Sequence, residues 1–176
     1  MLSLLSDFAI PMRTLLKVVV LAVLMSWFAA NAHDKSDDKN PELSFSCAWF
    51  DFIQHRNEAF GLTVEYRSSE YIWNFRPFIG MMTTEKGTAA SFAGLLMDIV
   101  LFSNLYLTPS FAPGMYYSGR GKEMYYGLEF RSQIELTYNL TFIRLGINFN
   151  HISNGHLYKI NPGVESLSFN LILPLN

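Results

Sequence analysis

The chain has 176 residues, of which 50% are hydrophobic, 15% are aromatic and only 16% are charged. This composition excludes a disordered chain, which needs low hydrophobicity and high charge, and the formal net charge of −2 excludes a basic surface for nucleic acid. The single cysteine, Cys47, excludes an intramolecular disulfide and a metal site built from cysteines. The length suits one domain.

The first feature in chain order is an apolar segment near the N-terminus. Arg13 and Lys17 form a basic flank, residues 15–28 are almost entirely apolar, and Ala30-Asn31-Ala32 matches the small-x-small rule for cleavage. These features predict that residues 1–32 are a secretory signal peptide with an upstream extension. An uncleaved anchor helix is the alternative interpretation.

Residues 33–42 (HDKSDDKNPE) are polar and are predicted to be a loosely held lead-in. The remainder, 43–176, consists of short segments rich in aromatic and β-branched residues, in which apolar side chains recur with period two, as in strands. We expect strands near residues 43–53, 60–68, 71–83, 88–101, 104–116, 126–139, 142–153 and 164–174.

The clearest alternation lies in residues 126–138. Leu128, Leu136 and their neighbours of the same parity are apolar except for Ser132, whereas Glu129 and Arg131 belong to the opposite parity. About a dozen residues is long for a strand of a soluble sandwich, and suits a strand that crosses a membrane in a barrel. The pattern therefore favours a barrel strand whose apolar face contacts lipid and whose polar face lines the lumen.

We therefore predict an all-β fold, an eight-stranded antiparallel transmembrane β-barrel of the outer membrane. Eight is an even number, and it is small enough for side chains to fill the lumen. The residues that could pair inside the lumen are Arg76, Asp98, Glu129, Arg131, Glu135 and Arg144. A soluble lipocalin-like barrel is the alternative, because the sequence does not say which face of a strand is outside.

The connections between the expected strands alternate in length. Residues 69–70, 102–103 and 140–141 form tight joints, whereas most of the others, including 117–125 and 154–163, are longer. Outer-membrane barrels have short periplasmic turns and longer external loops. We therefore expect 154–163 to face the cell exterior.

Three polar residues gather beside this last long connection. His151 and Ser153 continue the apolar parity of their strand, and Glu165 begins the apolar parity of the next. All three should therefore project outward at one rim of the barrel. A serine, an imidazole and a carboxylate are the parts of an activated nucleophile, although His or Ser at a strand end is more often simply interfacial.

The sequence around these residues resembles a known family, the outer-membrane lipid A 3-O-deacylases of the PagL type. The match consists of F-x-H-x-S-N at 149–154, N-P-G at 161–163 and a glutamate twelve residues after the serine. A weaker strand pattern extends the resemblance over about 43–174. It implies an eight-stranded outer-membrane barrel with an active site on its exterior wall.

Carried over by position, the resemblance implies that Ser153 is the nucleophile, His151 the general base and Glu165 the acid that orients it. Asn154 would contribute to the oxyanion hole. The order Gly155-His156 departs from the family pattern, which often has a small residue and then glycine after the asparagine. The chain also ends in Pro-Leu-Asn instead of an aromatic residue.

The resemblance implies that the substrate is lipid A of lipopolysaccharide, that the partners are outer-membrane lipids, and that neither a metal nor a cofactor is required. It leaves open whether the protein forms a homodimer. The main alternative function is a non-catalytic outer-membrane barrel with a structural or adhesive role. An acyltransferase or phospholipase on the same scaffold is a further alternative.

Overall fold

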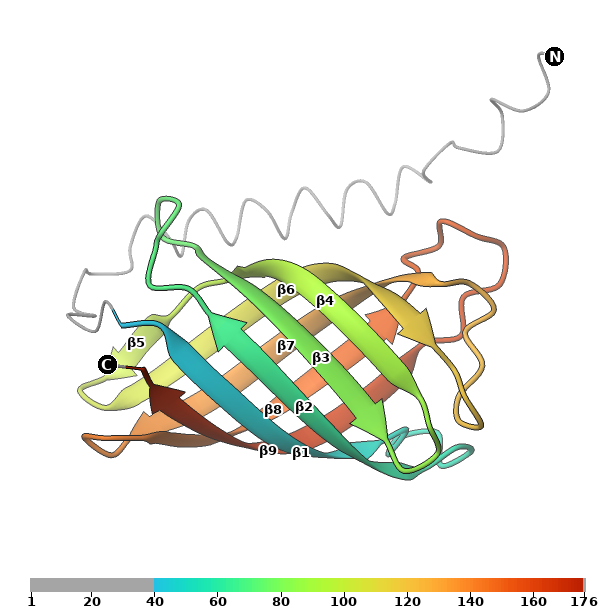
Figure 1. The fold of residues 1–176 in the computed structure, drawn as a ribbon, viewed down its shortest axis with the longest axis horizontal. Helices are drawn as coiled ribbons and strands as arrows, with labels where there is room; N and C mark the ends of the chain where they lie inside the picture. The colour runs from blue at the N-terminus through green and yellow to red at the C-terminus, as the bar shows by residue number, and fades with distance from the viewer. Residues whose placement is uncertain (1–39, 176) are drawn as a thin grey trace, which may run out of the picture.

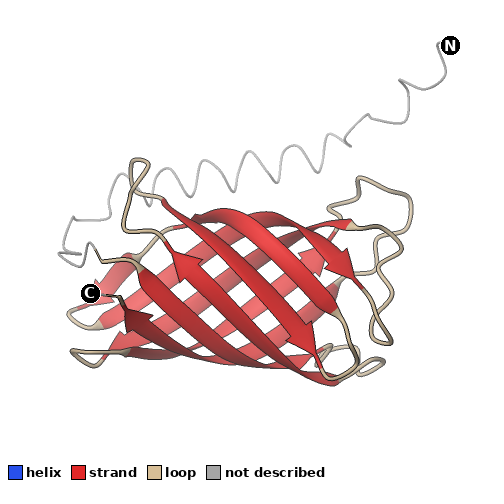
Figure 2. Ribbon diagram, in the orientation of Figure 1, coloured by secondary structure: helices blue, strands red, loops and turns tan. Residues whose placement is uncertain are grey.

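The computed structural model describes residues 40–175, which form antiparallel strands wrapped into a barrel (Figure 1). The strands are β1 (Glu42–Phe50), β2 (Ala59–Arg67), β3 (Arg76–Thr84), β4 (Ala89–Leu96), β5 (Ile99–Phe102), β6 (Leu105–Tyr117), β7 (Leu128–Asn139), β8 (Arg144–Ser153) and β9 (Val164–Pro174). Figure 2 shows strands joined by loops throughout this part of the chain. No helix in it is long and apolar enough to cross a membrane. The predicted signal peptide, 1–32, lies outside the described residues, as does most of the lead-in.

The barrel is closed by pairing between distant strands. The first strand, β1, pairs with the last, β9, and β4 pairs with β6. Since β4 and β5 follow one another along the same edge of β6, the nine segments form eight strands around the barrel. The predicted eight-stranded antiparallel barrel is thus confirmed.

The fourth strand is interrupted, whereas the sequence predicted one strand over 88–101. In a regular strand successive side chains face opposite sides, but Leu96 and Met97 are both buried, each only 1% exposed. Asp98 accepts hydrogen bonds from Thr108, at 2.7 Å, and from Arg76, at 2.9 Å. The break between β4 and β5 therefore lies where this carboxylate is drawn into the lumen.

The third strand begins later than expected. Residues 68–75 connect β2 to β3, so the predicted tight turn at 69–70 is wrong. Ile72 and Phe75 form an isolated bridge around Trp73, whose φ of 59° is left-handed. The alternating apolar residues here belong to an exposed loop, in which Trp73 is 89% exposed.

The two faces of each strand have opposite chemistry. On β7, Ile134 and Tyr138 face outward and are 58% and 50% exposed, whereas Glu135 faces inward and is 1% exposed. An apolar exterior around a polar interior is the pattern of a membrane barrel and the reverse of a soluble lipocalin-like one. The prediction that the apolar parity faces outward is therefore confirmed.

Two clusters of buried ion pairs fill the lumen. In one cluster Arg76 and Arg144 share Glu42 and Asp98. In the other, Arg67 and Arg131 share Glu65, and Arg67 also contacts Glu135. Glu129 was expected to join them, but within residues 40–175 its carboxylate has no hydrogen-bond partner. Buried charges are tolerated when they are paired in this way.

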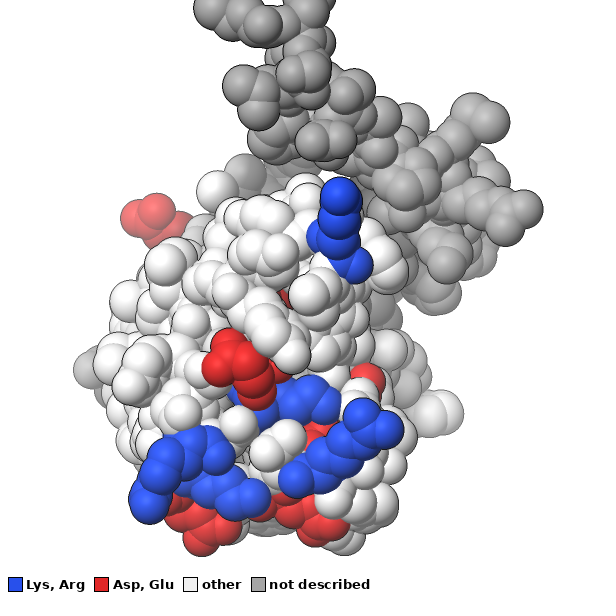
Figure 3. Space-filling model, turned by 90° about the vertical axis from the view of Figure 1, so that its right-hand side faces the viewer, with Lys and Arg blue, Asp and Glu red and all other residues white. Residues whose placement is uncertain are grey.

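One end of the barrel carries the connections 51–58, 85–88, 118–127 and 154–163 (Figure 1). Beneath them the lumen is apolar, with Phe50, Phe92, Met124, Ile152 and Val164 among its buried residues. Viewed from this end, basic and acidic side chains gather mainly on the lower part of the face, and much of the remaining face is uncharged (Figure 3). The polar rim and the apolar wall match the boundary between water and lipid.

Candidate active site

His151 and Glu165 lie opposite each other on adjacent strands. They are register partners of β8 and β9, and both project to the outside of the barrel. His151 Nδ1 lies 3.0 Å from Glu165 Oε1. Because an ionised carboxylate can only accept a hydrogen bond, Nδ1 donates and the other ring nitrogen, Nε2, keeps a lone pair. This arrangement prepares the imidazole to act as a base.

The environment of the pair is partly exposed. The side chain of His151 is 39% exposed and that of Glu165 is 17% exposed. The second oxygen of Glu165, Oε2, is buried and has no hydrogen-bond partner among residues 40–175. The imidazole is therefore the hydrogen-bond partner of this carboxylate in the described part of the chain.

Ser153 ends β8 on the same outward face as His151, two residues further along. It is half-buried, and its register partner on β7 is Phe130, which stacks on Phe111. In the described part of the chain the Ser153 hydroxyl makes no hydrogen bond, so the structure brings together the histidine and the glutamate but leaves the serine unlinked to them. Such bonds often form fully only when substrate is bound.

Asn154 lies at the start of the loop after β8 and is fully buried. Its side-chain N–H donates to the carbonyl of Ile160 at 2.8 Å, and its Oδ1 accepts from the backbone of His156 at 3.1 Å. Its own backbone N–H donates to Asn161 Oδ1 at 3.0 Å. These bonds hold the loop 154–161 together, so the predicted role of Asn154 in an oxyanion hole stays a prediction.

The order Gly155-His156 produces two successive residues with a φ of 64°. Glycine adopts this left-handed conformation freely, whereas histidine adopts it less often. The bond from the His156 N–H to Asn154 Oδ1 helps to hold it there. The departure from the family pattern is therefore accommodated without opening the loop.

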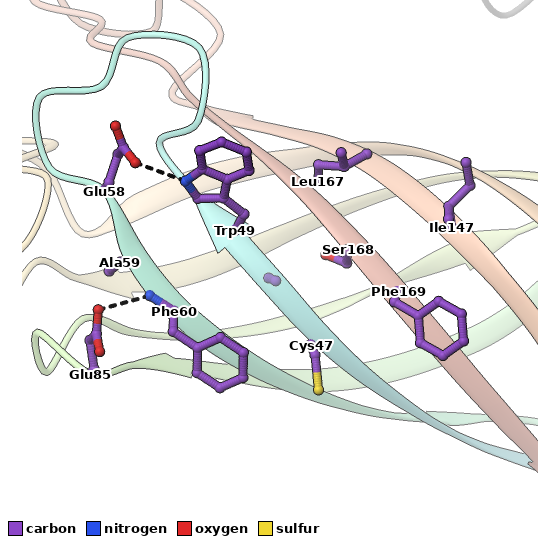
Figure 4. Close-up of a pocket in the computed structure, with 11 residues that line it drawn as sticks. Cys47, Trp49, Glu58, Ala59, Phe60, Glu85, Ile147, Leu167, Ser168 and Phe169 are labelled. Atoms are coloured by element: carbon purple, nitrogen blue, oxygen red, sulfur yellow. Dashed lines mark hydrogen bonds between the residues drawn. The ribbon is translucent and has the colours of Figure 1, made fainter.

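The wall around the site is apolar. Phe149 projects outward two residues before His151 and packs edge-on against Phe52 of the loop after β1, with ring centroids 6.0 Å apart. On the side of β9, a groove of about 530 Å³ runs over Trp49, Phe60, Leu167 and Phe169, among other residues (Figure 4). The predicted triad lies outside this groove, on the open wall.

Glu58 and Glu85 lie at the polar edge of the groove. The Trp49 indole N–H donates to Glu58 at 3.0 Å, and the Phe60 backbone N–H donates to Glu85 at 3.0 Å (Figure 4). The bond from Trp49, together with a contact from His55, lowers the pKa of Glu58. Its carboxylate is thus ionised at neutral pH and marks the polar border of the wall.

Some residues around the site were missed at the level of sequence. Asn161 and Gly163 belonged to the N-P-G match but were given no role of their own, and Gln54 was not considered. Asn161 in fact accepts a bond from the backbone of Asn154, and the carbonyl of Gly163 accepts one from Gln54. The recurrence of asparagine at both ends of one loop was the available signal. Among the described residues, no group of three or more His, Cys, Asp or Glu side chains could hold a metal ion.

Comparison with known proteins connects this geometry to a family. The model of the family described as lipid A 3-O-deacylase (PagL) matches residues 39–174. The crystal structure of the outer membrane enzyme PagL is similar at a TM-score of 0.60 and 15% identity, covering 76% of this chain and 99% of that one. The comparison with curated proteins found no match.

Two other barrels share the fold at lower identity. A de novo designed transmembrane β-barrel matches with a TM-score of 0.59 and 4% identity, covering 80% of this chain and 98% of the design. Neisserial surface protein A matches with a TM-score of 0.52 and 11% identity, covering 77% and 96%. At these identities the similarities establish the architecture of a small membrane barrel.

Proposed function

The chain belongs to the lipid A 3-O-deacylase (PagL) family, and on that premise we propose that it is an esterase of the Gram-negative outer membrane that removes the 3-O-linked acyl chain of lipid A. The closed barrel with its apolar exterior supports a multi-pass location in that membrane. The substrate lies in the outer leaflet beside the barrel. Its acyl chain can therefore reach the wall without leaving lipid.

The observation that carries this proposal is the hydrogen bond between His151 and Glu165 on the lipid-facing side, with Ser153 on the same face. A polar pair is unfavourable on such a surface and needs a compensating role. Neither residue pairs with a lumenal charge. The chemistry of the pair is that of a base with its orienting acid.

In the proposed mechanism the Ser153 hydroxyl attacks the ester carbonyl while His151 Nε2 takes its proton. The tetrahedral intermediate collapses, and the protonated His151 gives that proton to the departing sugar oxygen. Water then attacks the acyl-serine, with His151 again acting as base. The products are a free 3-hydroxy fatty acid and lipid A with a free 3-hydroxyl. Glu165 keeps the ring oriented and stabilises its positive charge.

The oxyanion of the tetrahedral intermediate requires hydrogen-bond donors close to Ser153. We propose that the donors come from the loop 154–156, with Asn154 as the side-chain candidate. One such donor is worth roughly 3–4 kcal/mol of activation free energy. For the side chain of Asn154 to take this role, it must use the N–H that does not bond to Ile160.

The proposal is tested by mass spectrometry of lipid A from cells with and without the protein. Loss of one 3-hydroxy-acyl chain from the 3 position supports it. An unchanged lipid A would instead support a structural or adhesive barrel. Gain of a chain, or altered phospholipids, would point to an acyltransferase or a phospholipase.

A further inference from the structure

The main chain at Gly163 covers one side of the His151 ring. A methyl group at Gly163 would lie 2.3 Å from His151 Cε1, 3.1 Å from Nε2 and 3.4 Å from Nδ1. Side-chain carbons do not approach other heavy atoms as closely as 2.3 Å. Glycine is therefore the residue that lets the backbone lie directly against the imidazole.

The backbone conformation at position 163 does not require a glycine. In the described chain the glycines with left-handed φ are Gly87, Gly119 and Gly155, and Gly163 is not among them. Alanine could thus adopt the backbone conformation of Gly163 without strain. The requirement for glycine arises from the space that His151 occupies.

A chain of polar contacts holds Gly163 in place from the neighbouring loops. Gln54 Nε2 donates to the carbonyl of Gly163 at 3.1 Å. Lys122 Nζ donates to Gln54 Oε1 at 2.6 Å and lies 3.6 Å from Asp51 Oδ1. Lys122 and Asp51 are buried, whereas Gln54 and its bond to Gly163 are exposed to water.

The same chain also reaches the strand that carries Glu165. The backbone N–H of Asp51 donates to the backbone carbonyl of Glu165 at 2.8 Å. Contacts from the loop 51–58 therefore fix the backbone on both sides of the start of β9. The backbone of Glu165 and the backbone of Gly163, which lies against the imidazole, are thus held by the same loop.

We propose that Gly163 is a positioning residue for the His151 base, and that Gln54 and Lys122 hold it in that position. The inference rests on the proposed function. The His151 side chain is 39% exposed on the lipid side. Packing on that side therefore does not prevent the ring from rotating outward about its two side-chain bonds. The Gly163 backbone restricts that rotation of the ring.

The test is Gly163→Ala, with Gly127→Ala as the matched control. Both are loop glycines near the same rim, and a methyl group at Gly127 would meet Met115 at an ordinary 3.4 Å. The added methyl at Gly163 displaces a side chain that can rotate away, so folding is preserved while the base is misplaced. Misplacement by about 1 Å can cost about 10²-fold in rate.

We expect Gly163→Ala to lower kcat about 10²-fold with little change in KM, and to slow labelling of Ser153 by a fluorophosphonate in the same proportion. The heat-modifiable migration of the folded barrel on gels should be unchanged. Gly127→Ala should match the wild type in all three measurements. A folded Gly163→Ala protein with wild-type kcat and labelling rate would overturn the inference.

A second pair of variants tests the same inference without touching the glycine. Gln54→Leu removes the bond to Gly163, and Arg56→Leu changes an exposed residue of the same loop whose side chain has no hydrogen bond or ion pair in the described structure. We expect Gln54→Leu to lower kcat and the labelling rate several-fold, and Arg56→Leu to change neither. Equal rates for the two variants would contradict the role of Gln54.

Failure of the proposed function would look different. If Ser153→Ala retained full activity, the serine mechanism itself would fail. If Ser153→Ala is inactive while Gly163→Ala and Gln54→Leu behave as the wild type, the mechanism stands and the positioning inference fails.

Discussion

At the scale of single residues, the position of the three polar side chains on the wall limits the free-energy penalty of exposing them to lipid. His151 and Ser153 lie at the end of β8, and Glu165 lies at the beginning of β9. The penalty for polar side chains on a lipid-facing strand is greatest at the middle of the membrane and falls to about 0–1 kcal/mol near its boundary. The proposed catalytic residues at the rim can therefore contact lipid without destabilising the barrel.

The residues of the proposed triad should be separable by their kinetic effects. Ser153→Ala and His151→Ala should each lower turnover by about 10⁴–10⁶-fold, because nucleophile and base act as a unit. Glu165→Ala should have a smaller effect, of the order of 10⁴-fold at most, since its task is to orient the ring. The measurement is release of 3-hydroxy fatty acid from purified lipid A in detergent with EDTA present.

All three variants should fold, because none of these side chains fills the lumen. Wild-type activity in a folded Ser153→Ala protein would show that another group is the nucleophile. A requirement of the wild-type protein for added metal would contradict the serine-hydrolase mechanism.

Asn154 and Asn161 can be distinguished because they share a loop but not a predicted chemical role. If Asn154 supplies an oxyanion donor, Asn154→Ala should lower kcat by about 10²–10³-fold. Asn161→Ala removes the acceptor for the Asn154 backbone N–H and should lower kcat by much less. Comparable kcat losses in both variants would mean that Asn154 acts by ordering the loop.

At the scale of the elements, the break between β4 and β5 brings Asp98 into the lumen. There it accepts bonds from Arg76, Thr108 and Arg144, which belong to three other strands. One carboxylate thus joins β3, β6 and β8. The bonds of Asp98 to these strands compensate for the backbone hydrogen bonds lost at the break between β4 and β5.

Asp98→Ala should destabilise the barrel and leave its chemistry intact. We expect a loss of about 3 kcal/mol in the free energy of unfolding, at the low end for a broken buried ion pair, because Glu42 still pairs with both arginines. Urea unfolding in detergent micelles measures it, with Ser103→Ala in the exposed turn as control. Unchanged stability, or a lower kcat per folded molecule, would contradict this prediction.

At the scale of the whole molecule, the two ends of the barrel differ. The end with the site carries 118–127 and 154–163, whereas the opposite end carries the shorter turns after β5 and β7 and the connection 68–75. The length of 68–75 is an exception to the pattern used to predict orientation. The orientation therefore needs a direct test.

We predict that 118–127 and 154–163 face the exterior. Trypsin added to intact cells should cleave at Arg120 or Lys159, which are exposed. Chymotrypsin should reach Trp73, which is 89% exposed at the opposite end, only after permeabilisation. The reverse pattern of cleavage would overturn the orientation.

Much of this architecture was predictable from the sequence alone. Alternation along 126–138 predicted a long strand with one apolar and one charged face, because side chains of a strand alternate strictly. The same parity put His151, Ser153 and Glu165 on one outward rim, as the structure places them. Which face was outside remained undecided until the closed barrel showed the charges buried and paired.

Other features depend on contacts between residues distant in sequence, which the periodicity of a segment does not reveal. The run Tyr71 to Phe75 alternates like a strand but forms a loop, because ladder pairing depends on a neighbour that local sequence does not contain. Asp98 interrupts its strand because arginines distant in sequence meet it in the lumen. In the sequence Gly163 was only part of the N-P-G match, but in the structure it contacts His151, because the pairing of β8 with β9 brings them together.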